Sequence, residues 1–194
     1  MTGDGRKRGQ HHGDAREALL CAAAASLETT GAAHLSLRGI AERAGLSRQA
    51  PYNHFTDKEA MLANLVVAGF ESLIHAMEAA SGALAGEAAL GAAGEAYIAF
   101  AQATPARFRL MFACERIDHG RFPAIAAAET RAFAVLRAIV GTMAPPARVE
   151  AISLTAWCIV HGYATLCIET GIETAGRRAE RAREFARTIA AAAG

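Results

Sequence analysis

Arg48 and Gln49 are adjacent residues whose side chains suit the recognition of nucleic-acid bases. The Arg48 guanidinium can donate two parallel hydrogen bonds to a guanine, and the Gln49 amide can pair with the edge of an adenine in the major groove. The sequence offers neither side chain an evident internal partner. We therefore interpret the pair as an exposed contact to DNA, provided that the surrounding segment presents it at the surface.

The segment 35–59 has the pattern of short helices joined by a tight turn. Ser36 can cap a first helix, and Gly45 can end it, because glycine enters the left-handed backbone region without a steric penalty. Ser47 can then cap a second helix, predicted over residues 48–54. Two helices around a Gly-containing turn are typical of a helix-turn-helix.

A third helix start follows at Thr56 and Glu59, which have the spacing of a T-x-x-E capping box. Pro51 is unusual inside the second predicted helix, but it lies at the end of the first turn, where at most one backbone hydrogen bond is lost. The three capped starts together predict a compact DNA-binding unit.

This segment closely resembles the DNA-binding domain of TetR-family transcriptional repressors. The resemblance is carried by Ser36-Leu37-Arg38, Ile40-Ala41, Ala44-Gly45-Leu46-Ser47, Tyr52, His54-Phe55 and Lys58-Glu59-Ala60-Met61-Leu62. It implies base or phosphate contacts by Ser36, Arg38, Ser47, Arg48, Gln49, Ala50, Tyr52, His54 and Lys58. A purely structural role stays open for some of them: Ser36 and Ser47 cap helices with or without DNA, and Tyr52 equally suits the core.

The composition favours an all-α protein. Of the 194 residues, 53% are hydrophobic, with alanine dominant, and only 5 are proline. Alternating apolar and polar runs, which would indicate strands, are absent. The formal net charge of +1 says little about partners, but the positive charge is concentrated before the first helix and within the motif.

Several functional classes are not expected from this sequence. The four cysteines form no C-x-x-C pair, the N-terminus lacks an apolar signal core, and we expect no segment to be apolar for long enough to span a membrane. Nucleophile elbows, phosphate-binding Gly-rich loops and H-E-x-x-H motifs are missing. We therefore expect a soluble cytoplasmic protein that is not an enzyme and needs no cofactor or metal.

About nine helices are predicted. Residues 1–13 are interpreted as a disordered basic arm, 14–60 as the helix-turn-helix domain, and 61–194 as a regulatory and dimerisation domain. Asp14 should cap the first helix, which should end at 29–31. After the motif, the predicted helices are 57–80, 87–103, 105–115, 122–143, 147–170 and 174–193.

The stretch from Trp157 to Gly162, with tryptophan followed by His-Gly, is a second and weaker resemblance. It looks like the C-terminal domain of one TetR subfamily that is named for these Trp-His-Gly residues. By this analogy, a pocket for an apolar or aromatic small molecule would be lined by Tyr97, Phe100, Phe108, Met111, Phe112, Trp157 and His161. An ordinary core also needs aromatic residues, so this alternative stays open.

The resemblance implies a homodimer joined through the eighth and ninth predicted helices. Two-fold symmetry implies a palindromic operator in double-stranded DNA, with half-sites about one helical turn, or a multiple of it, apart. We expect a repressor that an unidentified small-molecule effector releases from this operator. One alternative is a helical small-molecule carrier or enzyme with a vestigial DNA-binding domain. Another is an activator, or a repressor without a ligand.

Overall fold

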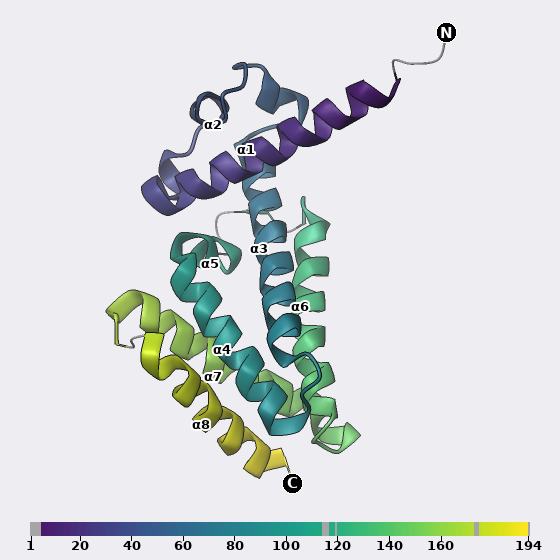
Figure 1. The fold of residues 1–194 in the computed structure, drawn as a ribbon, viewed down its shortest axis with the longest axis vertical. Helices are drawn as coiled ribbons and strands as arrows, with labels where there is room; N and C mark the ends of the chain where they lie inside the picture. Colours follow the sequence, from purple (N-terminus) through teal and green to yellow (C-terminus); the bar gives the residue numbers. More distant parts are fainter. Residues whose placement is uncertain (1–4, 114–116, 119, 173–174, 194) are drawn as a thin grey trace.

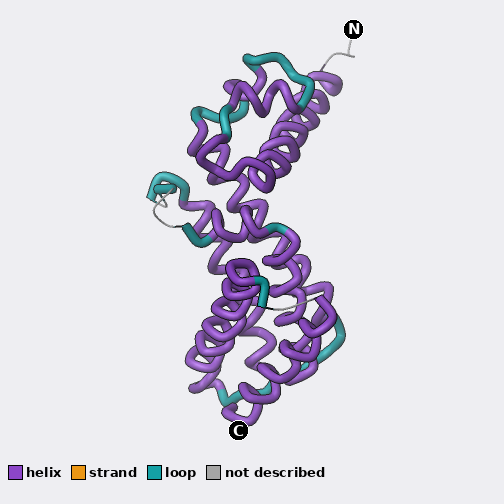
Figure 2. The backbone as a smooth tube through the Cα atoms, turned by 90° about the vertical axis from the view of Figure 1, so that its left-hand side faces the viewer, coloured by secondary structure: helices purple, strands orange, loops and turns teal. Residues whose placement is uncertain are grey.

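The computed structural model describes residues 5–113, 117–118, 120–172 and 175–193, with side chains from Asp14 onward except that of Ala175. The elements are α1 (Gly5–His34), α2 (Leu37–Arg43), η1 (Ala50–Asn53), α3 (Lys58–Ser81), α4 (Gly86–Ala103), α5 (Pro105–Met111), α6 (Pro123–Gly141), η2 (Pro146–Arg148), α7 (Val149–Thr170) and α8 (Ala175–Ala193). The described ranges contain helices and no strand, which confirms the all-α prediction. Figures 1 and 2 show α1 and α2 at the end of the molecule opposite the C-terminus.

The first helix is longer than predicted. It begins at Gly5, so the backbone of residues 5–13 is helical where we expected a disordered arm, and Asp14 lies inside the helix and does not cap it. A nucleated helix gains one hydrogen bond for each residue added, and the Arg, Lys and Gln of this stretch are good helix formers. At the other end, Gly31 interrupts the helix with φ 75° and ψ 162°, in agreement with the predicted end at 29–31.

The first helix of the motif follows the prediction. Ser36 caps α2, and its Oγ accepts a hydrogen bond from the Gly39 N–H at 3.1 Å. Gly45, with φ 67°, lies just after the helix in the left-handed region. The next N–H, of Leu46, bonds back to the Ala41 carbonyl at 2.9 Å and closes the turn.

The second helix of the motif is not the predicted α-helix over 48–54. The chain instead forms a 3-10 helix, η1, in which the buried Pro51 occupies an early position. Proline has no N–H to continue an α-helical hydrogen-bond ladder, which explains the short turn. The predicted side-chain cap by Ser47 is also wrong, because Ser47 contributes only its carbonyl, which accepts from the Ala50 N–H at 2.9 Å.

The start of α3 is set by Asp57. Its Oδ1 accepts a hydrogen bond from the Ala60 N–H at 2.8 Å, one residue later than the predicted Thr56–Glu59 box would place the cap. Aspartate caps helices at least as well as threonine. The predicted box is therefore replaced by a single-residue cap.

One helix, α3, belongs to both parts of the molecule. Its buried residues run along its length, from Met61 near the DNA-binding unit to Phe70, Leu73 and Met77 in the C-terminal bundle. Figure 1 shows α3 descending from α1 into the bundle formed by α4 to α8. The predicted boundary between residues 60 and 61 thus falls inside a continuous helix.

The most extensive helix–helix contact in the described bundle is between α4 and α8. A Cβ atom on Gly91 would lie 3.4 Å from Cγ of Arg183 and 3.7 Å from Cβ of Ala186, which is ordinary contact. The small residues of α4 therefore let α8 approach closely.

Two helical segments, Lys58–Ser81 and Pro146–Thr170, are long and apolar enough to cross a membrane by length and composition alone. This corrects the expectation that no segment is. Half of the apolar window of α3 is buried inside the protein, as befits a core helix, whereas only 28% of the second window is. α7 therefore has an apolar face that the described residues of the single chain leave uncovered.

Candidate functional site

The proposed DNA-reading residues lie on the surface of the N-terminal unit. Arg38 on α2 is exposed, as are Arg48 and Gln49 in the turn before η1, and the Tyr52 side chain is 46% exposed. Within the described part of the chain, the side chains of Arg48 and Gln49 make no hydrogen bond or ion pair. Both are therefore available to an external partner, as the sequence suggested.

The other predicted contacts are placed less simply. Ala50 is half-buried, and so is His54, whose ring lies 6.4 Å from that of Phe55. The Lys58 ammonium donates to the Ala33 carbonyl at 3.0 Å, which ties the start of α3 to the end of α1. An ammonium has three donors, so this bond leaves Lys58 able to reach a phosphate as well.

A charged cluster links the DNA-binding unit to the bundle. Arg121, just before α6, pairs with Glu59 (Nη1–Oε2, 2.6 Å) and with Asp57 at the start of α3. Glu59 also accepts from the Asp118 N–H at 2.9 Å. The Arg121 hydrogen bond, followed by the Ala60 N–H, holds the pKa of Asp57 below its usual value.

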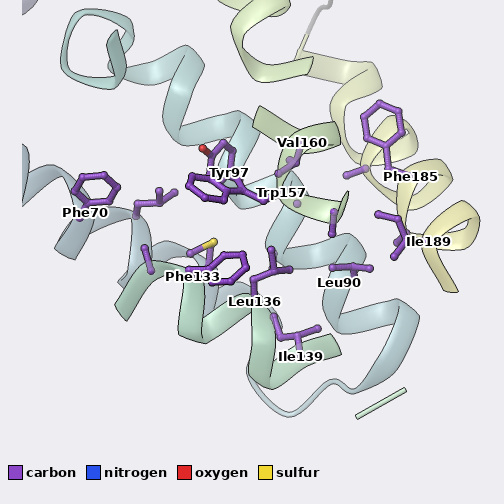
Figure 3. A pocket seen from close by; sticks show the side chains of 18 of the residues that line it. Phe70, Leu90, Tyr97, Phe133, Leu136, Ile139, Trp157, Val160, Phe185 and Ile189 are labelled. Carbon is purple, nitrogen blue, oxygen red and sulfur yellow. The ribbon is translucent and has the colours of Figure 1, made fainter. Parts of the chain in front are cut away.

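A cavity of about 290 Å³ lies inside the bundle between α3, α4, α6, α7 and α8. Figure 3 shows apolar side chains from these helices pointing towards it. Its walls are made by Phe70, Leu73, Met77, Leu90, Ala93, Gly94, Tyr97, Phe112, Glu129, Ala132, Phe133, Leu136, Ile139, Ala156, Trp157, Val160, Ala182, Phe185, Ala186 and Ile189. Among the described lining residues, Glu129 is the one that carries a formal charge.

Three of the seven predicted pocket residues line this cavity: Tyr97, Phe112 and Trp157. The other four do not. Phe108 and Met111 are 2% and 1% exposed and belong to the core, Phe100 packs against that core, and His161 lies behind Tyr97. The lining residues that we did not predict, such as Phe133 and Phe185, carry the same periodic apolar signal as any core residue, so no pattern could have singled them out.

A hydrogen-bonded pair, the buried Tyr97 and the half-buried His161, lies behind the cavity wall. The Tyr97 hydroxyl lies 2.9 Å from Nδ1 of His161. A phenol O–H can donate and a neutral imidazole nitrogen can accept, so the Tyr97 proton can be donated to Nδ1. His161 is then a neutral acceptor. Burial raises the pKa of Tyr97 and lowers the pKa of His161, so it favours the uncharged form of both groups.

Two family models match the chain. That of the bacterial regulatory proteins of the tetR family covers residues 19–65, and that of the tetracyclin repressor-like C-terminal domain covers residues 90–192. The chain belongs to the TetR family. It is a DNA-binding transcriptional regulator, and regulators of this family bind DNA, act as dimers and bind small molecules. The match of the C-terminal domain does not distinguish the Trp-His-Gly subfamily.

Solved structures share the whole fold. A Rhodococcus sp. RHA1 protein of unknown function is 30% identical, with a TM-score of 0.78 over 91% of this chain and 95% of that one. The TetR-family regulator PfmR from Thermus thermophilus is 22% identical, with a TM-score of 0.68 over 89% and 97%. FadR from Bacillus subtilis, solved with stearoyl-CoA, is 13% identical, with a TM-score of 0.74 over 90% and 97%. Comparison with curated proteins gives no match.

The half-buried His161 of this TetR-family chain makes its stability depend on pH. The lowered pKa of His161 means that the unfolded state takes up a proton first as the pH falls. We expect the free energy of unfolding to decrease from about pH 6.5 downwards, the ordinary pKa of histidine. The measurement is urea unfolding at several pH values for the wild type and for His161→Gln, whose amide oxygen can still accept from Tyr97.

The comparison concerns the slope with pH, because His161→Gln also loses ring contacts. The slope should flatten in this variant and stay unchanged in His75→Gln, which replaces an exposed histidine on α3. Equal slopes in the wild type and His161→Gln would contradict the assignment.

Proposed function

We propose that this regulator is a repressor in the cytoplasm that binds a palindromic operator as a homodimer and leaves it when an apolar small molecule fills the cavity. The observation that carries the DNA-binding part is the exposed pair Arg48 and Gln49, which has no partner within the described chain. Arg48 suits a guanine and Gln49 an adenine. Ala50 offers a methyl group to a thymine, while Ser36, Arg38, Ser47, Tyr52, His54 and Lys58 surround the pair as base or phosphate contacts.

Sequences selected from random DNA by the purified protein should reveal the operator. Arg38, Arg43 and Lys58 in two copies give about six phosphate contacts, so log K should fall with log salt at a slope of about −5, or roughly 10³-fold between 50 and 200 mM. Fluorescence anisotropy with the selected duplex measures this slope. An unrelated duplex of equal length is the control, and it should bind more weakly at every salt concentration.

Failure to select a common motif, or an affinity that hardly changes with salt, would contradict specific DNA binding by this chain. A slope that is the same for both duplexes, with equal affinities, would limit the protein to non-specific binding.

The proposed dimer forms through α7 and α8. Leu154 and Leu166 of α7 are 51% and 52% exposed, and the exposed Cys158 and Gly162 lie between them at four-residue spacing. Residues four apart share one helix face, so these positions form an apolar stripe. α8 packs beside α7, where the Tyr163 and Phe185 rings lie 5.0 Å apart. A two-fold axis at this face would present two recognition turns, the Arg48–Gln49 turn of each chain, to half-sites about 34–36 Å apart, or a multiple of that.

The proposed effector is apolar or aromatic. The cavity walls are mostly aliphatic and aromatic, and the Tyr97 hydroxyl is already hydrogen-bonded to His161. A polar ligand would therefore find few groups to replace its lost hydration. The placement of Trp157 at the cavity and of His161 behind Tyr97 supports the proposal that this C-terminal domain is of the Trp-His-Gly type.

Repression would be relieved through differential affinity of the effector for two conformations of the dimer. α3 belongs to both the cavity wall and the DNA-binding unit. A ligand that displaces its C-terminal half, which lines the cavity, therefore changes the position of α1 and α2. The distance between the two recognition turns would then no longer match the operator.

A further inference from the structure

The short helix α5 is capped by a residue from the DNA-binding unit. Pro105 at its first position has no N–H, and Thr104 provides no side-chain cap. The next two N–H groups, of Ala106 and Arg107, donate to Oε2 and Oε1 of Glu28, both at 2.9 Å. Glu28 lies on α1, 78 residues away in the sequence, and is half-buried.

These two bonds join unlike charges. The carboxylate is anionic, and the free N–H groups at a helix N-terminus carry the positive end of the helix dipole. Charge-assisted hydrogen bonds of this kind are stronger than neutral ones, and two of them fix the direction of the carboxylate. Glu28 therefore holds α5 at a defined position relative to α1.

The other side of α5 faces the cavity wall. The Phe108 ring lies 5.7 Å from that of Tyr97 and 5.3 Å from that of His161. Phe112, directly after α5, lines the cavity and lies 4.4 Å from His161, ring to ring. A ligand that moves Tyr97 or Phe112 thus acts on α5.

Two further contacts restrict how α5 can respond. A Cβ on Gly69 of α3 would lie 2.6 Å from Sδ of Met111, so α5 and α3 are in close contact. Arg109 pairs with Glu169 on α7 at 2.7 Å. Because neighbouring helices hold α5 on these sides, its displacement is transmitted to its N-terminal end, where Glu28 is bound.

We propose that Glu28 is the positioning residue that couples the effector cavity to the DNA-binding unit. The path runs from the Tyr97–His161 pair through α5 to the Glu28 carboxylate, and from there along α1 to the helices that it packs against. This inference rests on the proposed effector cavity and adds, beside α3, a second connection through which its occupancy reaches the DNA-binding unit.

Coupling can be measured without knowing the natural effector, because a coupling free energy is reciprocal between two sites. The probe is N-phenyl-1-naphthylamine, an uncharged apolar fluorophore, read by energy transfer from Trp157, the single tryptophan. Its Kd is measured with and without a saturating amount of the selected duplex. In the wild type, the duplex should weaken probe binding by about 5- to 150-fold.

Glu28→Ala should bind the probe alone and the duplex alone with nearly wild-type affinity, while the ratio of the two probe Kd values falls towards one. Glu28→Gln keeps one acceptor oxygen and should give an intermediate ratio. Glu17→Ala removes an exposed carboxylate from the same helix and should keep the wild-type ratio.

The outcomes separate the two proposals. If the duplex does not change probe affinity in the wild type, the cavity is not an effector site and both proposals fail. If it does, and Glu28→Ala keeps the full ratio, only the role of Glu28 is overturned. Thermal melting shows whether Glu28→Ala is folded, and if it is not, Glu28→Gln decides: a wild-type ratio in that variant overturns the proposal.

Discussion

Replacing both Leu154 and Leu166 by glutamate should convert the protein from dimer to monomer and weaken operator binding by about 10²- to 10⁴-fold, the usual gain from binding two linked half-sites. Both side chains are about half exposed on α7, so the single chain does not depend on them for its core. Burying four new carboxylates at a two-fold interface would be far costlier than leaving them in water. Sedimentation measures the mass, and anisotropy measures the affinity.

Leu84→Glu is the matched control, because Leu84 is 51% exposed in the loop between α3 and α4. It should remain dimeric and bind the operator normally. The melting temperature of the monomeric variant at low concentration shows that the chain still folds. A double variant that sediments as a dimer would place the interface elsewhere.

Replacing Arg48 by alanine should remove most of the preference for the operator. One bidentate contact to a guanine discriminates by about 1–3 kcal/mol, so two half-sites lose about 2–6 kcal/mol, or roughly 30- to 10⁴-fold in affinity. Binding to an unrelated duplex should fall much less, because only one charge per chain is removed. Competition between the selected and the unrelated duplex measures the specificity ratio directly.

Arg48→Lys distinguishes recognition from charge, since lysine keeps the charge but lacks the planar fork that pairs with two acceptors. It should lose specificity and retain non-specific affinity. Arg187→Ala, which removes an exposed arginine of α8, controls for the change in net charge. Unchanged specificity in Arg48→Ala would mean that other residues read the bases.

The local features of the fold could be read from the sequence. The Ser36 cap and the Gly45 turn depend only on neighbouring residues, and both lie where we predicted them. The prediction for residues 48–54 is less accurate, although Pro51, the residue that decides their conformation, is plain in the sequence. We predict an α-helix that tolerates Pro51, whereas the missing N–H of Pro51 makes this segment a 3-10 helix.

Contacts between distant parts of the sequence could not be predicted in the same way. The Glu28 cap of α5 and the Arg121 pairs with Asp57 and Glu59 join residues more than 60 positions apart. A single charged residue carries no signal of which distant helix end or carboxylate it will meet. The residues that line the cavity could not be predicted either. Phe133 and Phe185 have the sequence pattern of core residues and differ from them only because they border the cavity.

The continuity of α3 has a mechanical consequence. A helix of 24 residues is about 36 Å long. A rotation of about 5° around its lower end would carry its upper end sideways by about 3 Å, close to the spacing between successive base pairs. The helix is thus a lever that enlarges a sub-ångström rearrangement around the cavity to the length scale on which a duplex is read.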